Sequence, residues 1–73
     1  MTKEQYEHAK KNGCVDRLRG DEISRRIAKV YPLNTQIAIL MDKDTKPSEW
    51  QEYQSFREQI KSEVDAEMSA FEN

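Results

Sequence analysis

The sequence predicts an all-α protein, a small helical domain of three to four helices with a long amphipathic helix at its C-terminal end. Apolar residues in the last third recur every three or four positions, as they do on one face of a helix. Only two Gly and two Pro are present, and no segment alternates apolar and polar residues as a half-buried strand does. The net charge is only −2, which differs from the high net charge that is typical of disordered chains.

Residues 1–20 are expected to form a loosely ordered N-terminal arm or a short helix. Thr2 has the side chain of an N-cap, and Gly13 stands where such a helix would end. The apolar content is poor, because Tyr6 and Ala9 are almost the only residues that could line a buried face. Such a segment is typical of an arm that frays or that a partner orders.

The rest of the chain, residues 21–73, is expected to form one helical domain whose first two helices span about 21–31 and 34–42. Asp21 follows a glycine and suits the N-cap of the first, and Pro32 ends it. The second helix is apolar on nearly every side. A helix of that composition is usually buried, so it is predicted to form the centre of the core.

The third helix of this domain is predicted to span about residues 48–71, with Ser48 and Gln51 at the spacing of a capping box. Its apolar stripe comprises Trp50, Tyr53, Phe56, Ile60, Val64, Met68 and Phe71. The two preceding helices are too short to cover the whole stripe. Its C-terminal end is therefore expected to lack cover unless the N-terminal arm folds back over it.

Charge is unevenly distributed along the chain. Residues 1–31 contain eight Lys or Arg and five Asp or Glu, whereas residues 32–73 contain four and nine. The halves are therefore complementary, which favours antiparallel packing within one chain or between two copies. Individual exposed ion pairs contribute only about 0 to 1 kcal/mol.

No motif indicates an enzyme, a cofactor or a metal site. His8 lies in a polar segment without a second titratable group at a telling spacing, and we interpret it as a solvated surface residue. The lone Cys14 cannot form an intramolecular disulfide, and we interpret it as a small, partly buried apolar residue. The acidic residues around Asp42 lack the glycine and the alternating oxygen ligands of a calcium loop. We therefore predict that the protein is not an enzyme and that it has no cofactor.

A basic cluster offers an alternative, a small nucleic-acid-binding regulator. Arg17, Arg19, Arg25 and Arg26 could contact phosphates. The helix that would then read the bases carries almost no hydrogen-bond donors, and the chain is acidic overall, so nucleic-acid binding is the less favoured hypothesis. The chain has neither a long apolar run nor the apolar core of a signal peptide near Met1, and a cytoplasmic location without membrane contact is expected.

A pattern over residues 23–64 resembles small helical segments encoded by bacteriophages and prophages, similar to C-terminal segments of tail-fibre or tail-assembly chaperone-like proteins. The residues that carry it are Tyr31-Pro32-Leu33, Gln36 to Leu40, Asp44, Pro47 to Trp50, Tyr53, Phe56-Arg57 and Ile60-Lys61. The resemblance implies a structural or assembly role and no catalytic residues.

These observations lead to the hypothesis of a small non-enzymatic interaction or assembly protein, encoded by a phage or prophage. It would self-associate or bind a protein partner through its C-terminal helix, and no small molecule is indicated. The residues predicted to make that contact are Trp50, Ile60, Val64, Met68 and Phe71.

Overall fold

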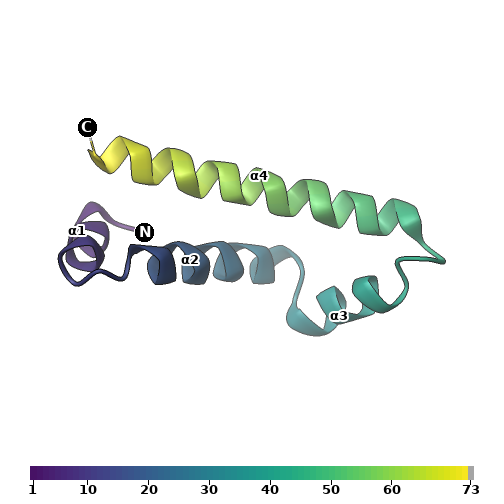
Figure 1. Ribbon diagram of the computed structural model, residues 1–73. Coiled ribbons are helices and arrows are strands. Elements are labelled where there is room, and N and C mark those ends of the chain that lie inside the picture. The colour runs from purple at the N-terminus through teal and green to yellow at the C-terminus, as the bar shows by residue number, and fades with distance from the viewer. Residues whose placement is uncertain (73) are drawn as a thin grey trace.

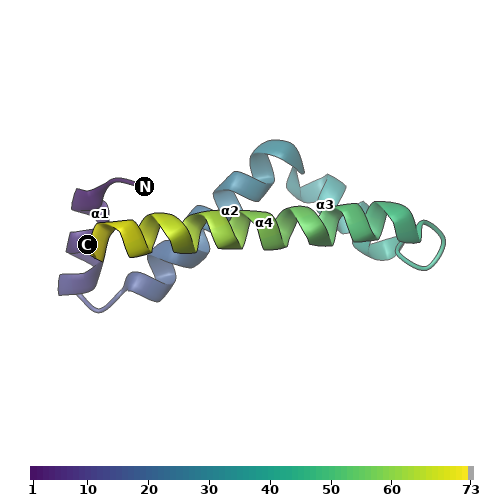
Figure 2. The same ribbon diagram turned by 90° about the horizontal axis from the view of Figure 1, so that it is seen from above.

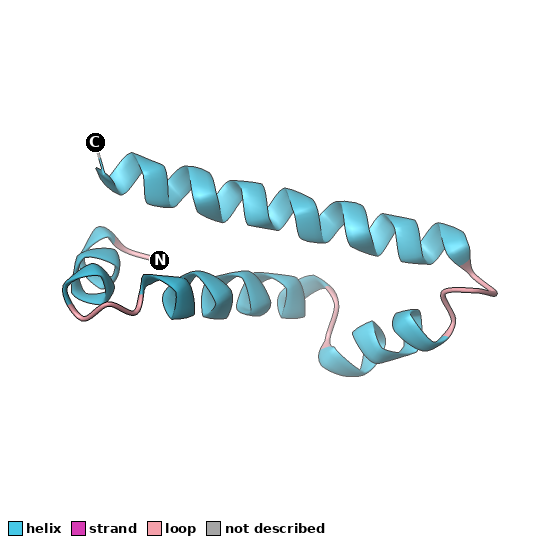
Figure 3. Cartoon of the chain, viewed as in Figure 1, coloured by secondary structure: helices cyan, strands magenta, loops and turns pink. Residues whose placement is uncertain are grey.

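A computed structural model describes residues 1–72; the last residue of the predicted domain, Asn73, lies outside the described residues. The described chain forms four helices and no strand (Figures 1 and 3): α1 (Lys3–Lys11), α2 (Val15–Val30), α3 (Leu33–Met41) and α4 (Pro47–Glu72). The all-α prediction with a long C-terminal helix is thereby confirmed. None of the helices in this described part is long and apolar enough to cross a membrane.

The molecule is an elongated helical hairpin with principal dimensions of 45 × 20 × 17 Å. Helices α2 and α4 run in opposite directions (Figure 1) and cross obliquely when viewed from above (Figure 2). Helix α1 lies beside the C-terminal end of α4, and α3 lies at the opposite end, near the start of α4. The two ends of the hairpin are therefore covered by different short helices.

One continuous core runs along the inside of this hairpin. Its buried side chains are Tyr6, Ile23, Ile27, Ile39, Tyr53, Ile60, Val64 and Met68. Val64 is 0% exposed and lies deepest of all. The apolar stripe predicted for the C-terminal helix therefore faces inward along most of its length, and the other three helices each contribute at least one residue to cover it.

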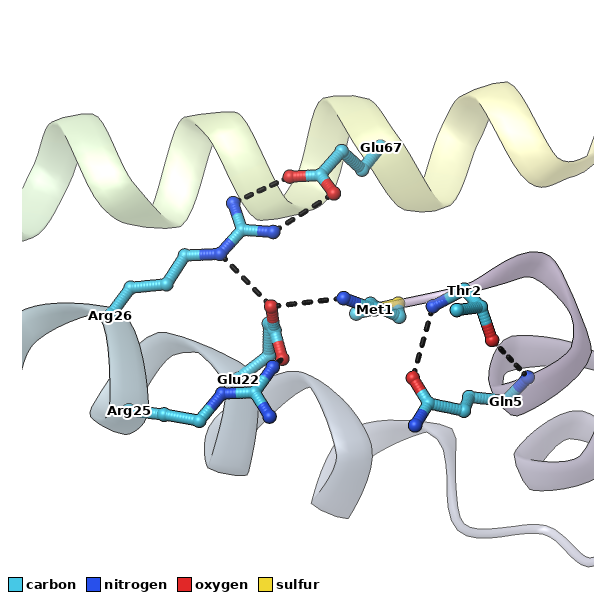
Figure 4. Close-up of polar contacts among 7 residues, drawn as sticks. All are labelled: Met1, Thr2, Gln5, Glu22, Arg25, Arg26 and Glu67. Carbon is cyan, nitrogen blue, oxygen red and sulfur yellow. Dashed lines mark hydrogen bonds and ion pairs between the residues drawn. The ribbon is translucent and has the colours of Figure 1, made fainter.

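Of the two alternatives expected for residues 1–20, a loosely ordered arm or a short helix, the structure has a short helix, α1. Thr2 and Gln5 form a reciprocal capping box, with the Gln5 N–H donating to Thr2 Oγ1 at 3.1 Å and the Thr2 N–H donating to Gln5 Oε1 at 3.0 Å (Figure 4). Tyr6 and Ala9 are buried, so two apolar residues suffice to dock the helix. Gly13, at φ +69°, then turns the chain into α2 through a conformation that side chains rarely adopt.

The start of the second helix was also predicted wrongly, because α2 begins at Val15 and not at Asp21. Gly20 lies within the helix, although a glycine there costs about 1 kcal/mol relative to alanine. Val15 and Leu18, which are half-buried, pack against the core and keep this segment helical. The added turns let α2 reach the C-terminal half of α4.

Helix α3 contradicts its prediction most clearly. Its bounds lie within one residue of those expected, but it is not the centre of the core: only Ile39 is buried. Helices α2 and α4 already bury each other's apolar stripes, and α3 packs against the end of the pair. Most of its apolar surface therefore faces solvent.

Helix α4 begins one residue before the predicted start. Pro47 occupies its first position, which suits proline because the missing N–H would have had no partner in the helix. Ser48 therefore lies inside the first turn, and the predicted capping box with Gln51 is not the N-cap arrangement of this helix.

Three ion pairs confirm that the basic first half packs against the acidic second half within one chain. Lys10 Nζ lies 2.8 Å from Glu72 Oε2, and Arg19 Nε lies 2.6 Å from Asp65 Oδ1. The third pair joins Arg26 to Glu67. The first two pairs are largely exposed and contribute little each, but together the three fix α1 and α2 against α4 in one register.

Candidate protein-interaction site

A cluster of exposed apolar side chains covers α3 and the end of α2. We call it the α3 patch, and its members are Val30, Leu33, Ile37, Leu40 and Met41. Each of them exposes at least 50% of its surface, and Met41 exposes 78%. Single exposed apolar residues are normal on soluble proteins, but a contiguous group of large ones is typical of a contact surface.

Gln36 links α3 to both neighbouring helices, and Ile39 anchors it in the core. Gln36 Nε2 donates to the Tyr31 carbonyl oxygen at 2.7 Å, and Gln36 Oε1 accepts from the Tyr53 hydroxyl at 2.6 Å. Tyr31 in turn contacts the rings of Tyr53 and Phe56 at centroid distances of 5.2 and 5.3 Å. These contacts hold α3 against the end of α2 and against α4, while Leu33, Ile37 and Leu40 stay at least half exposed.

A hollow of about 240 Å³ lies between α3 and the first turns of α4. Leu33, Ile37 and Leu40 line it from α3, and Trp50 and Arg57 line it from α4. The Arg57 guanidinium lies over the Tyr53 ring, 5.7 Å from its centroid. The Lys43 ammonium lies over the ring of Trp50, 5.6 Å from its centroid, and within residues 1–72 neither Arg57 nor Lys43 forms an ion pair.

Most of the residues predicted to bind a partner lie in the core. Ile60 and Met68 are 7% and 9% exposed, and Val64 is fully buried, so this end of the stripe is covered, as was expected only if the N-terminal segment folds back over it. Helix α1 provides the cover. The centroid of the Tyr6 ring lies 5.6 Å from that of the Phe71 ring, and the Tyr6 hydroxyl donates a hydrogen bond to the Glu72 carboxylate. Phe71 is only half-buried, and so is Trp50, which alone of the five lines the hollow beside α3.

The arginines of the nucleic-acid alternative are largely engaged by carboxylates. Arg25 and Arg26 both bind Glu22, and Arg26 also reaches across to Glu67 (Figure 4). Arg19 binds Asp65, and hydrogen bonding to that carboxylate raises the pKa of the arginine. Of these four arginines, Arg17 alone forms no ion pair with another described residue. The structure therefore does not gather these four guanidinium groups into one free phosphate-binding surface.

Glu22 is the one buried charged residue in the described chain, at 5% exposure. Besides binding Arg25 and Arg26, its carboxylate accepts a hydrogen bond from the terminal ammonium of Met1 at 3.2 Å (Figure 4). Burial alone raises the pKa of the Glu22 carboxyl, but the hydrogen bonds from Met1 and Arg26 outweigh it, so that its pKa lies below the usual value. Glu22 thus stays charged and joins α1, α2 and, through Arg26, α4.

A second hollow, of about 330 Å³, lies between α1 and α2. His8, Cys14, Arg17 and Asp21 lie along its walls. His8 is exposed and Cys14 is half-buried, as predicted from the sequence. The His8 imidazole contacts Asn12 and not the thiol, and no group of three potential metal ligands forms anywhere in residues 1–72. The arrangement shows no chemistry beyond a shallow surface depression.

The α3 patch was not predicted, because the apolar composition of this helix was interpreted as a sign of burial. The available signal was the position of this helix in the chain: it lies in the short segment between Pro32 and Pro47, which separates two longer helices. A short helix that joins two long antiparallel helices lies at their end, where it has few neighbours.

Comparison with family models finds no match, comparison with curated proteins finds no similar sequence, and comparison with solved structures finds no similar fold. The resemblance to phage-encoded helical segments therefore stays a prediction, and the α3 patch is interpreted from its own geometry.

Proposed function

We propose that this protein is a small non-enzymatic interaction module that binds another protein surface through the α3 patch. The observation that carries the proposal is that the most apolar helix of the chain is also the one in which four of the five large apolar side chains are at least half exposed. An assembly role in a phage or prophage, as the sequence resemblance implies, is compatible with such a module. The contact surface differs from the predicted one, since α3 replaces the C-terminal end of α4.

The energetics of the patch support a matching apolar partner. Covering five half-exposed side chains contributes roughly 4 to 8 kcal/mol, at about 1.5 to 3 kcal/mol for each fully buried side chain. Association costs about 4 kcal/mol or more in lost freedom of motion. If the partner surface were polar, the free energy of association would therefore be close to zero. If the partner surface is a second apolar patch, the favourable contribution from buried apolar surface doubles.

Site-specific photocrosslinking tests this proposal. With a benzophenone amino acid in place of Leu40, irradiation of the native cells is expected to trap the protein in a covalent adduct of higher mass, because the α3 patch faces its partner there. The matched control places the same amino acid at Ser62, an exposed position on α4. Equal crosslinking at both positions, or none at Leu40, would contradict the proposal.

A further inference from the structure

Two hollows adjoin where α2, α3 and α4 meet. One is the hollow of about 240 Å³ between α3 and α4, and the other, of about 370 Å³, is lined from α2 as well. Four residues line both hollows and therefore lie between them: Leu33, Gln36, Tyr53 and Arg57. We call the two hollows together the α3 groove. Leu33, Ile37 and Leu40 belong both to this groove and to the α3 patch, so a partner that covers the patch also covers the groove.

Among the described residues, Arg57 is the only charged one that lines either hollow. It is half-buried, its guanidinium lies over the Tyr53 ring, and it forms no ion pair within residues 1–72. Gln36 Oε1 already accepts from the Tyr53 hydroxyl, so the guanidinium is the main free polar group of the groove. Residues 42–46, which follow α3, include two Asp and two Lys and therefore add no net charge near it.

Any partner that covers the α3 groove also covers the Arg57 guanidinium. Removing a charged group from water without giving it a partner is strongly unfavourable, so an entirely apolar partner would lose much of the free energy that it gains at the α3 patch. A carboxylate avoids this loss, because its two oxygens accept a pair of parallel hydrogen bonds from the planar guanidinium. Since Arg57 lies between the two hollows, that carboxylate would lie between the two apolar groups that fill them.

We infer that the α3 groove binds a segment of another protein that carries an Asp or Glu between two large apolar side chains, with the carboxylate bound to Arg57. The inference rests on the proposed function and specifies the chemistry of its partner. A protein segment fits better than a small amphipathic acid, because the α3 patch extends beyond the groove. Val30 and Met41 are 58% and 78% exposed and line neither hollow, so a molecule confined to the groove would leave them uncovered.

Selection of binders from a displayed library of random peptides, with the unmodified chain as the target, tests the inference. The enriched peptides are expected to share an Asp or Glu flanked by large apolar residues. A synthetic copy of an enriched peptide should bind Arg57→Gln about tenfold more weakly or worse, as measured by fluorescence anisotropy. The Arg57→Glu variant should bind only after the acidic residue of the peptide is replaced by Lys, which restores opposite charges. Arg17→Gln is the matched control, since Arg17 also lacks an ion pair within residues 1–72 but lies outside the groove.

A Leu40→Asp variant separates failure of the inference from failure of the proposed function. Enriched peptides that lack an acidic residue, or that bind Arg57→Gln as tightly as the unmodified chain, would overturn the inference alone if Leu40→Asp abolishes their binding. Peptides that still bind Leu40→Asp, or a selection without any enriched peptide, would overturn the inference, and together with an absent crosslink at Leu40 they would overturn the proposed function too. Laurate that binds in an Arg57-dependent manner while no peptide does would assign the groove to a small amphipathic acid and overturn the inference. Circular dichroism of each variant confirms intact helices before affinities are compared.

Discussion

Replacing Val64 by aspartate is expected to unfold the protein at room temperature. Val64 is 0% exposed and belongs to the buried core, so the introduced carboxylate would be buried without a partner. That costs on the order of 5 kcal/mol or more. A core of this size supplies only about 3 to 5 kcal/mol in total, so the loss exceeds the stability. The far-ultraviolet circular dichroism signal of helix should largely disappear.

Leu33→Asp is the matched control for Val64→Asp. It introduces the same carboxylate on the α3 patch, at a residue that is 70% exposed. Leu33 is also the first residue of α3, where a negative charge suits the helix dipole. This variant should keep its full helical signal. A folded Val64→Asp variant, or an equally unfolded Leu33→Asp variant, would show that core and surface have been assigned to the wrong helices.

Glu22→Gln is expected to have the second largest effect, a loss of roughly 3 kcal/mol in the free energy of unfolding. The substitution keeps the shape of the side chain but leaves the Met1 ammonium and Arg26 without their shared carboxylate, and breaking a buried ion pair costs about this much. Urea unfolding monitored by circular dichroism at about pH 7 measures the difference between the variant and the unmodified chain.

The pH dependence of the destabilisation by Glu22→Gln distinguishes an effect of the lost charge from an effect of disturbed packing. The pKa of Glu22 is below its usual value in the folded protein, so its ionised form stabilises the fold above the unfolded pKa of 4.5, and that contribution disappears as the pH falls through the folded pKa. Hydrogen bonds from Arg19 and Arg26 likewise lower the pKa values of Asp65 and Glu67, so the unmodified chain should lose stability in acid. As the pH falls below 4.5, the difference in the free energy of unfolding between variant and parent should narrow, because the stabilisation by the Glu22 charge is progressively lost. A difference that stays equal from neutral to acidic pH would mean that the Glu22→Gln substitution disturbs packing and not charge.

The sequence predicted the positions of the helices better than it predicted which helices contact one another. The spacing from Tyr53 to Met68 defines one helix face, and that face is indeed buried. Thr2 identified the first helix correctly, because capping is local and depends on few residues. Asp21 and the preceding glycine predicted the wrong start for the second helix. Their local preference was outweighed by the contacts of Val15 and Leu18 with the core, and a local sequence pattern does not contain such contacts.

The interaction site could not be predicted for the same physical reason. Whether Val64 faces a partner or its own chain depends on α1 folding back, and that docking rests on Tyr6, Ala9 and the contacts to Glu72, which are distant in sequence. Whether Ile37 is buried depends on how much surface α2 and α4 leave available. Both questions concern which surfaces meet, whereas periodicity reports only which residues share a face.

Hydrogen exchange of the backbone amides, measured from dilute to concentrated protein, tests most directly whether α4 forms the core and α3 the contact surface. The amides of α4 around Val64 should be protected equally at all concentrations, because α1 and α2 cover them within one chain. The amides of α3 should exchange more readily than those around Val64 in dilute solution, because Ile39 is the only buried residue of α3. Strong protection of α3 in dilute solution, or protection around Val64 that depends on concentration, would contradict this account.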